Sequence, residues 1–420
     1  MPLSTRRALI GAGLAGGAVL VAGCDAEPEA DAPPATATPP AELAVPVFDP
    51  GDWDSVRAQF PLDPDVAQFA AFVLSPHTAQ VDAAIDFHRA RLGFDTEATL
   101  LDGPRLDDEV RAAAAGFAGG APAQYALTDS TTMGLGIVYG GLPLTGRDEV
   151  LSTTHDFFAT EDSLRLLGLR TGARVVRVSL YDDPAAATVD EMVDRLLAGV
   201  TPRTRAVAIT WVHSSTGVRT PVREIADALP DDVLLCVDGV HGFAAVDMDI
   251  PDLGCDFLAT GTHKWLFGPR GTGLVWGRDW APMTELIPTF TPTSPGGRMS
   301  PGGYHDFEHR WALSEAFAFH EQIGRTAVVD RTVEQATRLK EGLAGGPVTL
   351  VTPLDPEVSA GIVCLDVPGL APPDAMQRLR EQGIAASVTP YATSYLRLGP
   401  SIVTDADEVD AAVEAVAALA

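Results

Sequence analysis

Residues 255–273 read CDFLATGTHKWLFGPRGTG, and they contain the most informative lysine of the chain. An apolar run typical of a buried strand ends in small and hydroxyl residues, and a turn rich in glycine and proline follows. Of the 29 lysine and arginine residues only two are lysines, Lys264 and Lys340. Unlike arginine, a desolvated lysine can lose its proton and become a nucleophile, as Schiff-base chemistry requires. Lys264 is therefore a candidate catalytic residue, and the alternative is a surface lysine in an arginine-rich chain.

The chain before this stretch alternates between helix-like and strand-like segments from about residue 105. Strands are predicted at 124–130, 148–154, 173–180, 206–215, 232–241 and 255–264. Helices are predicted at 106–119, 131–144, 160–172, 189–200 and 221–230. This alternation is typical of βαβ units, and strands that are apolar throughout indicate a sheet with helices on both faces. We therefore expect an α/β fold with a mostly parallel, doubly wound sheet.

The domain organisation follows from this pattern. We predict a large domain over 105–305, and a linking helix with a smaller C-terminal α/β domain over 306–420, with a helix break near Gly324. Residues 48–104 form an N-terminal segment whose helices have no packing partner evident from the sequence. The glycine- and proline-rich residues 294–303 predict a mobile stretch of the kind that closes over sites.

The first 24 residues differ from the rest of the chain. Arg6 and Arg7 precede an apolar stretch, and the sequence VAGC ends at Cys24. The stretch is too short and too rich in glycine for a transmembrane helix. It resembles a twin-arginine export signal with a lipobox, which predicts lipidation of Cys24 and a periplasmic or cell-envelope location. An ordinary N-terminal helix is the alternative. Residues 25–47 predict a disordered, acidic Pro/Ala tether.

Composition excludes some classes of function. The formal net charge of −28 would repel a phosphate backbone, so nucleic acid is not an expected partner. Cys236, Cys255 and Cys364 lie in apolar runs and are predicted to be buried free thiols. His305, Glu308 and His309 have no third ligand at suitable spacing, so we predict no metal site.

Polar residues follow each predicted strand at its carboxyl end, where ligands bind in doubly wound sheets. Singly they have ordinary explanations, such as an N-cap threonine, a loop histidine or a turn aspartate. The set comprises Thr131, Thr132, His155, His213, Ser214, Ser215, Asp238, His241, Thr262, His263 and Lys264. Together they predict a site for pyridoxal 5'-phosphate.

The chemistry of this cofactor explains the residue types. Lys264 would supply the amine of an internal imine, and Asp238 the carboxylate that keeps the pyridine nitrogen protonated. His241 is a donor for the phenolic oxygen, and His155 is the candidate for stacking on the ring. A helix N-terminus with hydroxyl groups suits the phosphate, which Thr131, Thr132 and Thr262 offer; Ser215 and His263 complete the predicted cofactor site.

These motifs resemble the class V aminotransferase family of fold-type I pyridoxal phosphate enzymes, most closely its isopenicillin N epimerase-like branch, over about residues 60–415. The motifs are THKWLFGPRGTG, VDGVHGF, TDSTTMG, HDFFATEDSLR, HSSTGVRTPV and YLRLGPSIVTDADEVD. The resemblance implies that Arg397 binds the substrate carboxylate, for which a planar guanidinium is well suited. It also implies a homodimer.

Two departures from the family pattern stand out. Where the family often has a Gly-Thr pair that reaches the phosphate across the dimer, this chain reads FEHRWA, and Arg310 is a hypothetical replacement. Members that form an enzyme persulfide use a cysteine before the substrate arginine, whereas Tyr391 stands there. Cys364 has the pattern of a core residue, so persulfide chemistry is disfavoured.

We therefore predict an enzyme that acts at Cα of an amino acid or amine, as an aminotransferase or epimerase, with Lys264 as general base. Two alternatives remain. One is a C–S lyase without a persulfide cysteine, and the other is an exported lipoprotein that binds the cofactor or an amine without turnover. Lys264, Asp238 and Arg397 argue against the second alternative, because a decayed site should lose such residues first.

Overall fold

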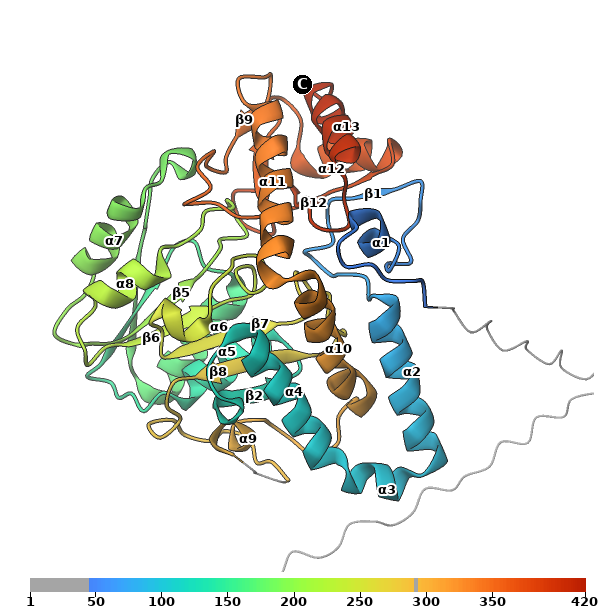
Figure 1. Cartoon of the computed structure of the whole chain (residues 1–420). Helices are drawn as coiled ribbons and strands as arrows, with labels where there is room; N and C mark the ends of the chain where they lie inside the picture. Colours follow the sequence, from blue (N-terminus) through green and yellow to red (C-terminus); the bar gives the residue numbers. More distant parts are fainter. Residues whose placement is uncertain (1–44, 291–293) are drawn as a thin grey trace, which may run out of the picture. The chain divides into compact units, whose positions relative to one another are not determined.

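The computed structural model describes residues 45–290 and 294–420, and Figure 1 shows their arrangement. The predicted export signal, Cys24 and all but the last three residues of the predicted tether lie outside the described residues. Among the residues described, no helix is both long enough and apolar enough to cross a membrane.

A seven-stranded sheet forms the centre of the fold. Its order is β2 (Tyr125–Thr128), β8 (Gly273–Gly277), β7 (Phe257–Gly261), β6 (Leu234–Asp238), β5 (Thr204–Thr210), β3 (Glu149–Thr153) and β4 (Arg174–Val178). The strands from β7 to β4 are parallel, and β8 runs antiparallel to both of its neighbours. The predicted α/β fold with a mostly parallel sheet is confirmed. The sequence reading missed β8, the strand that follows the Lys264 turn.

Helices cover both faces of this sheet. Alternate residues of a strand therefore pack into two different apolar clusters, one on each face. On β5, Val207 and Ile209 belong to one apolar cluster, while Ala206 and Ala208 belong to the other. Full burial of a valine or isoleucine contributes about 1.5–3 kcal/mol, so both faces stabilise the sheet. The helices between its strands are α5 (Thr131–Gly141), α6 (Phe158–Thr171), α7 (Val189–Ala198) and α8 (Val222–Ala228).

The N-terminal segment packs against the long helices that follow the sheet. α2 packs on α10, and α10 also packs on α4, which gives the packing partner that the sequence did not reveal for the helices of residues 48–104. Gly324 has φ +97° and separates α10 from α11, as the predicted break required. These helices are α1 (Trp53–Arg57), α2 (Ala79–Phe94), α3 (Thr96–Leu101), α4 (Gly103–Ala118), α10 (Phe307–Ile323) and α11 (Arg325–Leu343).

The C-terminal part contains a second sheet, of order β12-β13-β10-β9. A further strand, β11, pairs in parallel with β1 of the N-terminal segment. The elements are β1 (Ala67–Gln68), β9 (Thr349–Leu350), β10 (Val363–Asp366), α12 (Pro372–Glu381), β11 (Ile384–Ala385), β12 (Ser387–Val388), β13 (Leu396–Leu398) and α13 (Ala406–Ala417). Both sheets fall within the ranges expected for the two domains, and the boundary at residue 305 stays a prediction.

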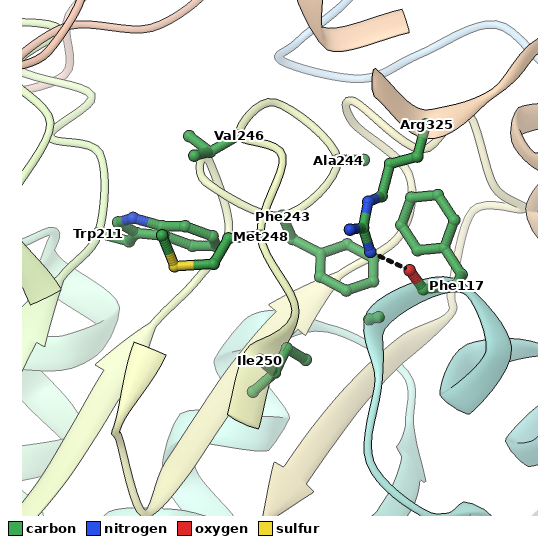
Figure 2. Close-up of a pocket in the computed structure, with 9 residues that line it drawn as sticks. Phe117, Trp211, Phe243, Ala244, Val246, Met248, Ile250 and Arg325 are labelled. Atoms are coloured by element: carbon green, nitrogen blue, oxygen red, sulfur yellow. Dashed lines mark hydrogen bonds between the residues drawn. The ribbon is translucent and has the colours of Figure 1, made fainter. Parts of the chain in front are cut away.

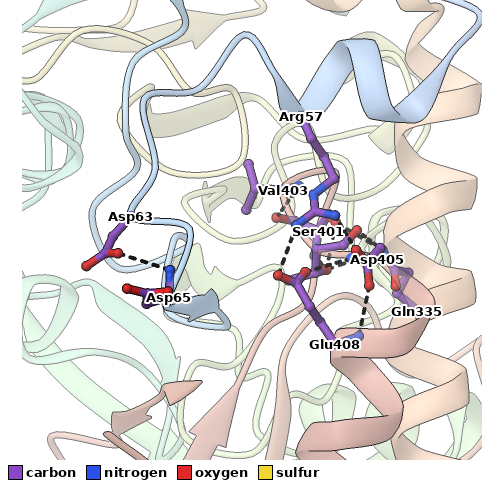
Figure 3. A network of polar contacts seen from close by, with 9 residues as sticks. Arg57, Asp63, Asp65, Gln335, Ser401, Val403, Asp405 and Glu408 are labelled. Carbon is purple, nitrogen blue, oxygen red and sulfur yellow. Dashed lines mark hydrogen bonds and ion pairs between the residues drawn. The ribbon is translucent and has the colours of Figure 1, made fainter. Parts of the chain in front are cut away.

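A polar network fastens the N-terminal segment to this part (Figure 3). Arg57 of α1 pairs with Asp405, and its Nη2 lies 2.9 Å from Glu408 Oε1. Asp405 and Glu408 also cap α13 reciprocally. Gln335 of α11 donates to the carbonyl oxygen of Thr404 at 2.6 Å. Residues far apart in the sequence thus stabilise one helix N-terminus.

Residues 294–300, which belong to the predicted mobile stretch, pack against the central sheet. They include α9 (Pro295–Arg298), and a Cβ added at Gly296 would lie 2.4 Å from the carbonyl oxygen of Tyr125 in β2. Ser300 Oγ accepts a hydrogen bond from the backbone N–H of Leu127 at 2.9 Å. In this part of the predicted mobile stretch, the glycines allow close packing against the edge strand β2.

Candidate active site

A cavity of about 270 Å³ lies at the carboxyl ends of the sheet strands. Eight predicted site residues line it together: Thr131, Thr132, Ser214, Asp238, His241, His263, Lys264 and Arg397. They come from α5, from the end of β6, from the turns after β5, β6 and β7, and from β13 of the C-terminal sheet. The carboxyl ends of parallel strands meet at one edge of a sheet, which explains why most of this set converges.

Lys264 lies in the turn between β7 and the reversed strand β8. Burial, and then the charge of Arg397, lowers the pKa of Lys264 to about 8, although Asp238 opposes the shift. Its Nζ lies 3.4 Å from His241 Nε2. The lowered pKa increases the unprotonated fraction of the amine near neutral pH, as a nucleophile or general base requires.

Asp238 ends β6, and its side chain is only 1% exposed. Its Oδ1 accepts from the N–H of Val240 at 3.1 Å, and its Oδ2 accepts from Thr160 Oγ1 at 3.3 Å. Burial raises the pKa of Asp238 to about 6, against the effect of the Val240 hydrogen bond. A buried carboxylate of this kind is stabilised by a cationic partner, which the protonated pyridine nitrogen of the cofactor provides.

His241 is a neutral hydrogen-bond donor at this site. Burial, followed by the charges of Lys264 and Arg397, holds the pKa of His241 well below its usual value. Trp265 Nε1 donates to His241 Nδ1 at 3.3 Å, so the proton of the neutral ring belongs on Nε2. This N–H faces the Lys264 amine and is a suitable donor for the phenolic oxygen of the cofactor.

The segment that follows the His241 turn, residues 243–250, lines a small apolar pocket together with Phe117, Trp211 and Arg325 (Figure 2). A Cβ added at Gly242 would lie 2.2 Å from the Trp211 ring, so the turn packs tightly on that ring. Arg325 donates to the carbonyl oxygen of Phe117 at 2.5 Å and pairs with Asp249 at 2.6 Å. These contacts fix the far end of the turn.

The N-terminus of α5 forms a cradle that fits a phosphate group. Thr131 Oγ1 and His263 Nδ1 are buried, and neither has a hydrogen-bond partner among the described residues. A Cβ at Gly261 would lie 2.9 Å from His263 and 3.0 Å from Thr131, so glycine keeps this space open. The first backbone N–H groups of a helix also lack intrahelical acceptors. The residues present therefore fit the cofactor.

Three of the predicted cofactor-binding residues, Thr262, Ser215 and His155, do not line the cavity. Thr262 Oγ1 donates to the carbonyl oxygen of Thr272 at 3.1 Å and supports the Lys264 turn from inside. Ser215 Oγ is buried without a partner among the described residues, in the turn that follows β5. Neither hydroxyl is brought to the cavity surface.

His155 also lies outside the residues that line the cavity, in contrast to the predicted stacking on the cofactor. Its ring stacks on Tyr181 at a centroid distance of 4.0 Å, and its Nε2 accepts from the N–H of Leu180 at 3.2 Å. Burial lowers the pKa of His155 to about 4, so the ring is neutral. Phe157, two residues further along, lines the cavity. The sequence signal HDFF contained this second aromatic candidate.

Arg397 is 6% exposed and lines the cavity next to the C-terminal sheet. Its guanidinium donates to Ser387 Oγ at 3.0 Å, to the carbonyl oxygen of Ser214 at 3.1 Å and to that of Val388 at 3.3 Å. It also lies over the Phe72 ring, 5.0 Å from the centroid. Among the described residues, no carboxylate forms an ion pair with it.

Other residues singled out in the sequence lie elsewhere. Arg310 faces Asp107 at 3.7 Å and Asp129 at 4.0 Å, and it does not line the cavity. Cys236, Cys255 and Cys364 are free and buried, as predicted. Within 45–290 and 294–420, no cluster of three candidate metal ligands occurs.

Some residues that line the cavity were not predicted. Val73 comes from the segment before α2, and Pro390 follows β12. Both are apolar residues outside the strand-end pattern, so only the three-dimensional packing reveals them. Thr210, the last residue of β5, followed the strand-end rule and could have been found.

Comparisons with known proteins show the family of the chain. The model of the family described as "Aminotransferase class-V" matches residues 105–410. Isopenicillin N epimerase of Streptomyces clavuligerus is 27% identical over 402 residues, covering 88% of this chain and 98% of its own. The chain belongs to the class V aminotransferase family.

Solved structures share the fold. The cystine C–S lyase C-DES in complex with cysteine persulfide has a TM-score of 0.78 and 21% identity, covering 86% of this chain and 99% of its own. A C-DES mutant with glycine covalently linked to the PLP cofactor has a TM-score of 0.77 and 21% identity, covering 86% and 98%. The protein is a pyridoxal phosphate-dependent enzyme of this family.

Proposed function

We propose that this enzyme acts at Cα of a small amino acid with a free carboxylate, as an epimerase or aminotransferase. The observation that carries the proposal is the bonding of Arg397. A guanidinium has five N–H donors, and here Nε, Nη1 and Nη2 each donate once to the protein. One N–H therefore remains on each terminal nitrogen, and this pair matches the two oxygens of a carboxylate.

The neighbouring residues support chemistry at Cα. Pyridoxal phosphate, when bound, supplies a ring that withdraws electrons from the substrate Cα. Lys264 would hold the cofactor covalently and then move the proton at Cα. Asp238 would bind the pyridine nitrogen, His241 would donate to the phenolic oxygen, and Thr131 and Thr132 would bind the phosphate. Phe157, rather than His155, is the aromatic residue available to the ring.

Epimerisation is favoured as the first reaction to test. A relative whose sequence aligns with this chain over 98% of its own length is named isopenicillin N epimerase. Removal of the Cα proton is common to epimerisation and transamination. The relation supports the reaction type without specifying the substrate of this chain.

A C–S lyase is the second candidate, supported by likeness to the cystine C–S lyase C-DES. A route through an enzyme persulfide is disfavoured, because the three described cysteines are buried and Tyr391 stands in the segment before Arg397. Binding without turnover is the third candidate. It is disfavoured by the intact set of Lys264, Asp238 and Arg397 in one cavity.

The experiment is a panel of L- and D-amino acids incubated with the cofactor-loaded enzyme in D₂O. Deuterium at Cα with a changed D/L ratio indicates epimerisation, and an oxo acid indicates transamination. Release of sulfide or persulfide from cysteine or cystine without Cα exchange of other amino acids would favour the lyase. If no amino acid changes although the cofactor absorbance band is normal, binding without turnover is the only one of the three candidates that remains.

We further propose that the protein is exported in a folded, cofactor-loaded state and anchored through Cys24. The support is the Arg6-Arg7 pair and the VAGC sequence. Replacing both arginines by lysine should keep the protein in the cytoplasm, and Cys24→Ser should release it from the membrane fraction. Membrane retention of Cys24→Ser would contradict the anchor.

A homodimer is also proposed from the family resemblance. Exposed apolar side chains on α6 support it, since Phe158, Leu166 and Leu169 are 62%, 54% and 73% exposed in the isolated chain. Sedimentation should give a dimer, and replacing these residues by glutamate should weaken it. A monomer at micromolar concentration would contradict the proposal.

A further inference from the structure

The wall of the cavity that holds Arg397 also carries a pair of hydroxyl groups. Ser214 lines the cavity, and its Oγ lies 2.6 Å from Tyr391 Oη. Tyr391 follows Pro390, which lines the same cavity, and its ring lies at a centroid distance of 6.0 Å from that of Phe157. The tyrosine is thus in contact with three residues of the cavity wall.

The pair is held in place by the C-terminal sheet. Tyr391 belongs to the segment that joins β12 to β13, and the ends of this segment are closed by hydrogen bonds between Thr389 and Tyr395 at 2.8 and 3.0 Å. The carbonyl oxygen of Ser214 accepts from Arg397 Nη1 at 3.1 Å. The hydroxyl pair and the proposed carboxylate-binding group therefore share Ser214, so a substrate bound by Arg397 lies next to the pair.

Lys264 belongs to a different wall. It follows β7, and its hydrogen bond is to His241 of the turn after β6. Burial raises the pKa of Tyr391, which keeps its hydroxyl protonated near neutral pH. The cavity thus has an amine that can accept a proton on one element, and a hydroxyl pair that can donate one on another.

We propose that Tyr391, acting through its hydrogen bond with Ser214, is the second proton-transfer group of the site and delivers the proton that inverts Cα. This inference rests on the proposed function at Cα. A single base returns the proton to the face from which it came, whereas inversion needs a donor on the opposite face.

The proton and electron balance of the step is simple. The Cα–H bond breaks, Lys264 Nζ takes the proton, and the electron pair stays with the bound substrate and cofactor. A new Cα–H bond forms with the proton of Ser214, and Ser214 takes the proton of Tyr391. The Tyr391 phenolate, close to the Arg397 charge, regains a proton from water after product release, while Lys264 loses its proton to water.

Tyr391→Phe is the critical variant, because it removes only the hydroxyl. Cofactor-loaded wild-type and variant enzymes are incubated in D₂O with each enantiomer of a substrate from the panel, and configuration and deuterium content are measured separately. In Tyr391→Phe we expect inversion to fall by about 100-fold, while deuterium still enters the enantiomer whose Cα–H faces Lys264. Ser214→Ala should act in the same direction. Tyr395→Phe is the matched control, since among the described residues no hydrogen bond joins its hydroxyl to a residue of the cavity lining, whereas the Tyr391 hydroxyl is bonded to Ser214.

Cofactor affinity and absorbance give a readout that does not depend on turnover, and both should be unchanged in Tyr391→Phe. Inversion by Tyr391→Phe at the wild-type rate would overturn the inference, and so would equal loss of exchange and inversion with the absorbance intact. Wild-type enzyme that exchanges Cα–H only with retention would also overturn it and leave the proposed function standing. Absence of any exchange in the wild type would instead reject the proposed function.

Discussion

Burial lowers the pKa of both lysines of this chain to about 8, although one follows β7 and the other lies on α11. Their bonding differs. Lys340 is 1% exposed, and its Nζ donates to the carbonyl oxygens of Pro353 and Leu354 at 2.9 Å and to Ser359 Oγ at 2.7 Å. Lys264 has one contact, at 3.4 Å, and lines a cavity. A lowered pKa alone therefore does not identify a reactive lysine; an amine with free bonding capacity beside a cavity does.

The largest expected effect is on covalent attachment of the cofactor. Borohydride reduction of the loaded wild-type enzyme should trap the cofactor on the peptide that contains Lys264, as detected by mass spectrometry. Lys264→Ala should lose this adduct, and turnover should fall by about 10²–10⁴-fold or more. Lys340→Ala is the matched control and should keep the adduct. An adduct on Lys340 in the wild type would reverse the comparison.

The second prediction concerns stability. Lys340→Met leaves two buried acceptors and one partly buried acceptor without their donor, so the free energy of unfolding should fall by about 2–4 kcal/mol. Lys264→Met removes a desolvated amine with one weak contact, and it should change the free energy of unfolding by less than about 1 kcal/mol. Urea denaturation of the two variants without cofactor measures both values. Equal decreases in the free energy of unfolding would show that the two amines contribute equally to stability.

The same contrast explains which part of the site could be predicted from the sequence. Thr131, Asp238, His241 and Lys264 each follow an apolar strand, and parallel strands deliver their carboxyl ends to one edge. The strand-end rule therefore predicts their convergence without any knowledge of packing. The alternation of strand-like and helix-like segments predicts the sheet itself, apart from β8. The apolar run of β8 is short, and its sequence is equally compatible with a loop.

Ser214 also follows a strand, β5, but the other members of its wall, Arg397 and Tyr391, obey no such rule. The resemblance indicated Arg397, but the contact between Ser214 and Tyr391 joins residues 177 positions apart through two different sheets. Which of His155 and Phe157 is available to stack on the cofactor depends on Tyr181, because the Tyr181 ring stacks on the His155 imidazole. These are outcomes of tertiary packing between elements that the sequence pattern leaves independent, so the sequence alone could not decide them.

The third prediction tests how the two walls interact. Because the charge of Arg397 lowers the pKa of Lys264, Arg397→Met should raise it. The pH dependence of cofactor attachment to the apoprotein, followed by absorbance, should then shift to higher pH.

Arg397→Lys is the control for this variant. It keeps the positive charge and should leave the pH dependence nearly unchanged, but it loses the bidentate fork, so the substrate KM should rise by about tenfold. A downward shift in Arg397→Met would mean that the charge of Arg397 does not act on Lys264.

The smallest expected effect is a change in how stability depends on pH. The unfolded chain keeps a lysine proton up to about pH 10.5, whereas folded Lys264 and Lys340 release theirs from about pH 8. Between these values the two lysines bind more protons in the unfolded state, so their contribution to the free energy of unfolding should rise with pH. Measurements from pH 8 to 10 on the cofactor-free wild type, Lys264→Met and Lys340→Met isolate this contribution, because the difference in the free energy of unfolding between the wild type and each variant should rise with pH. Other titrating groups cancel in the difference from the wild type. If this pH-dependent difference appears only for Lys340→Met, the Lys264 amine is already solvated through the cavity, and its reactivity would come from its position rather than from desolvation.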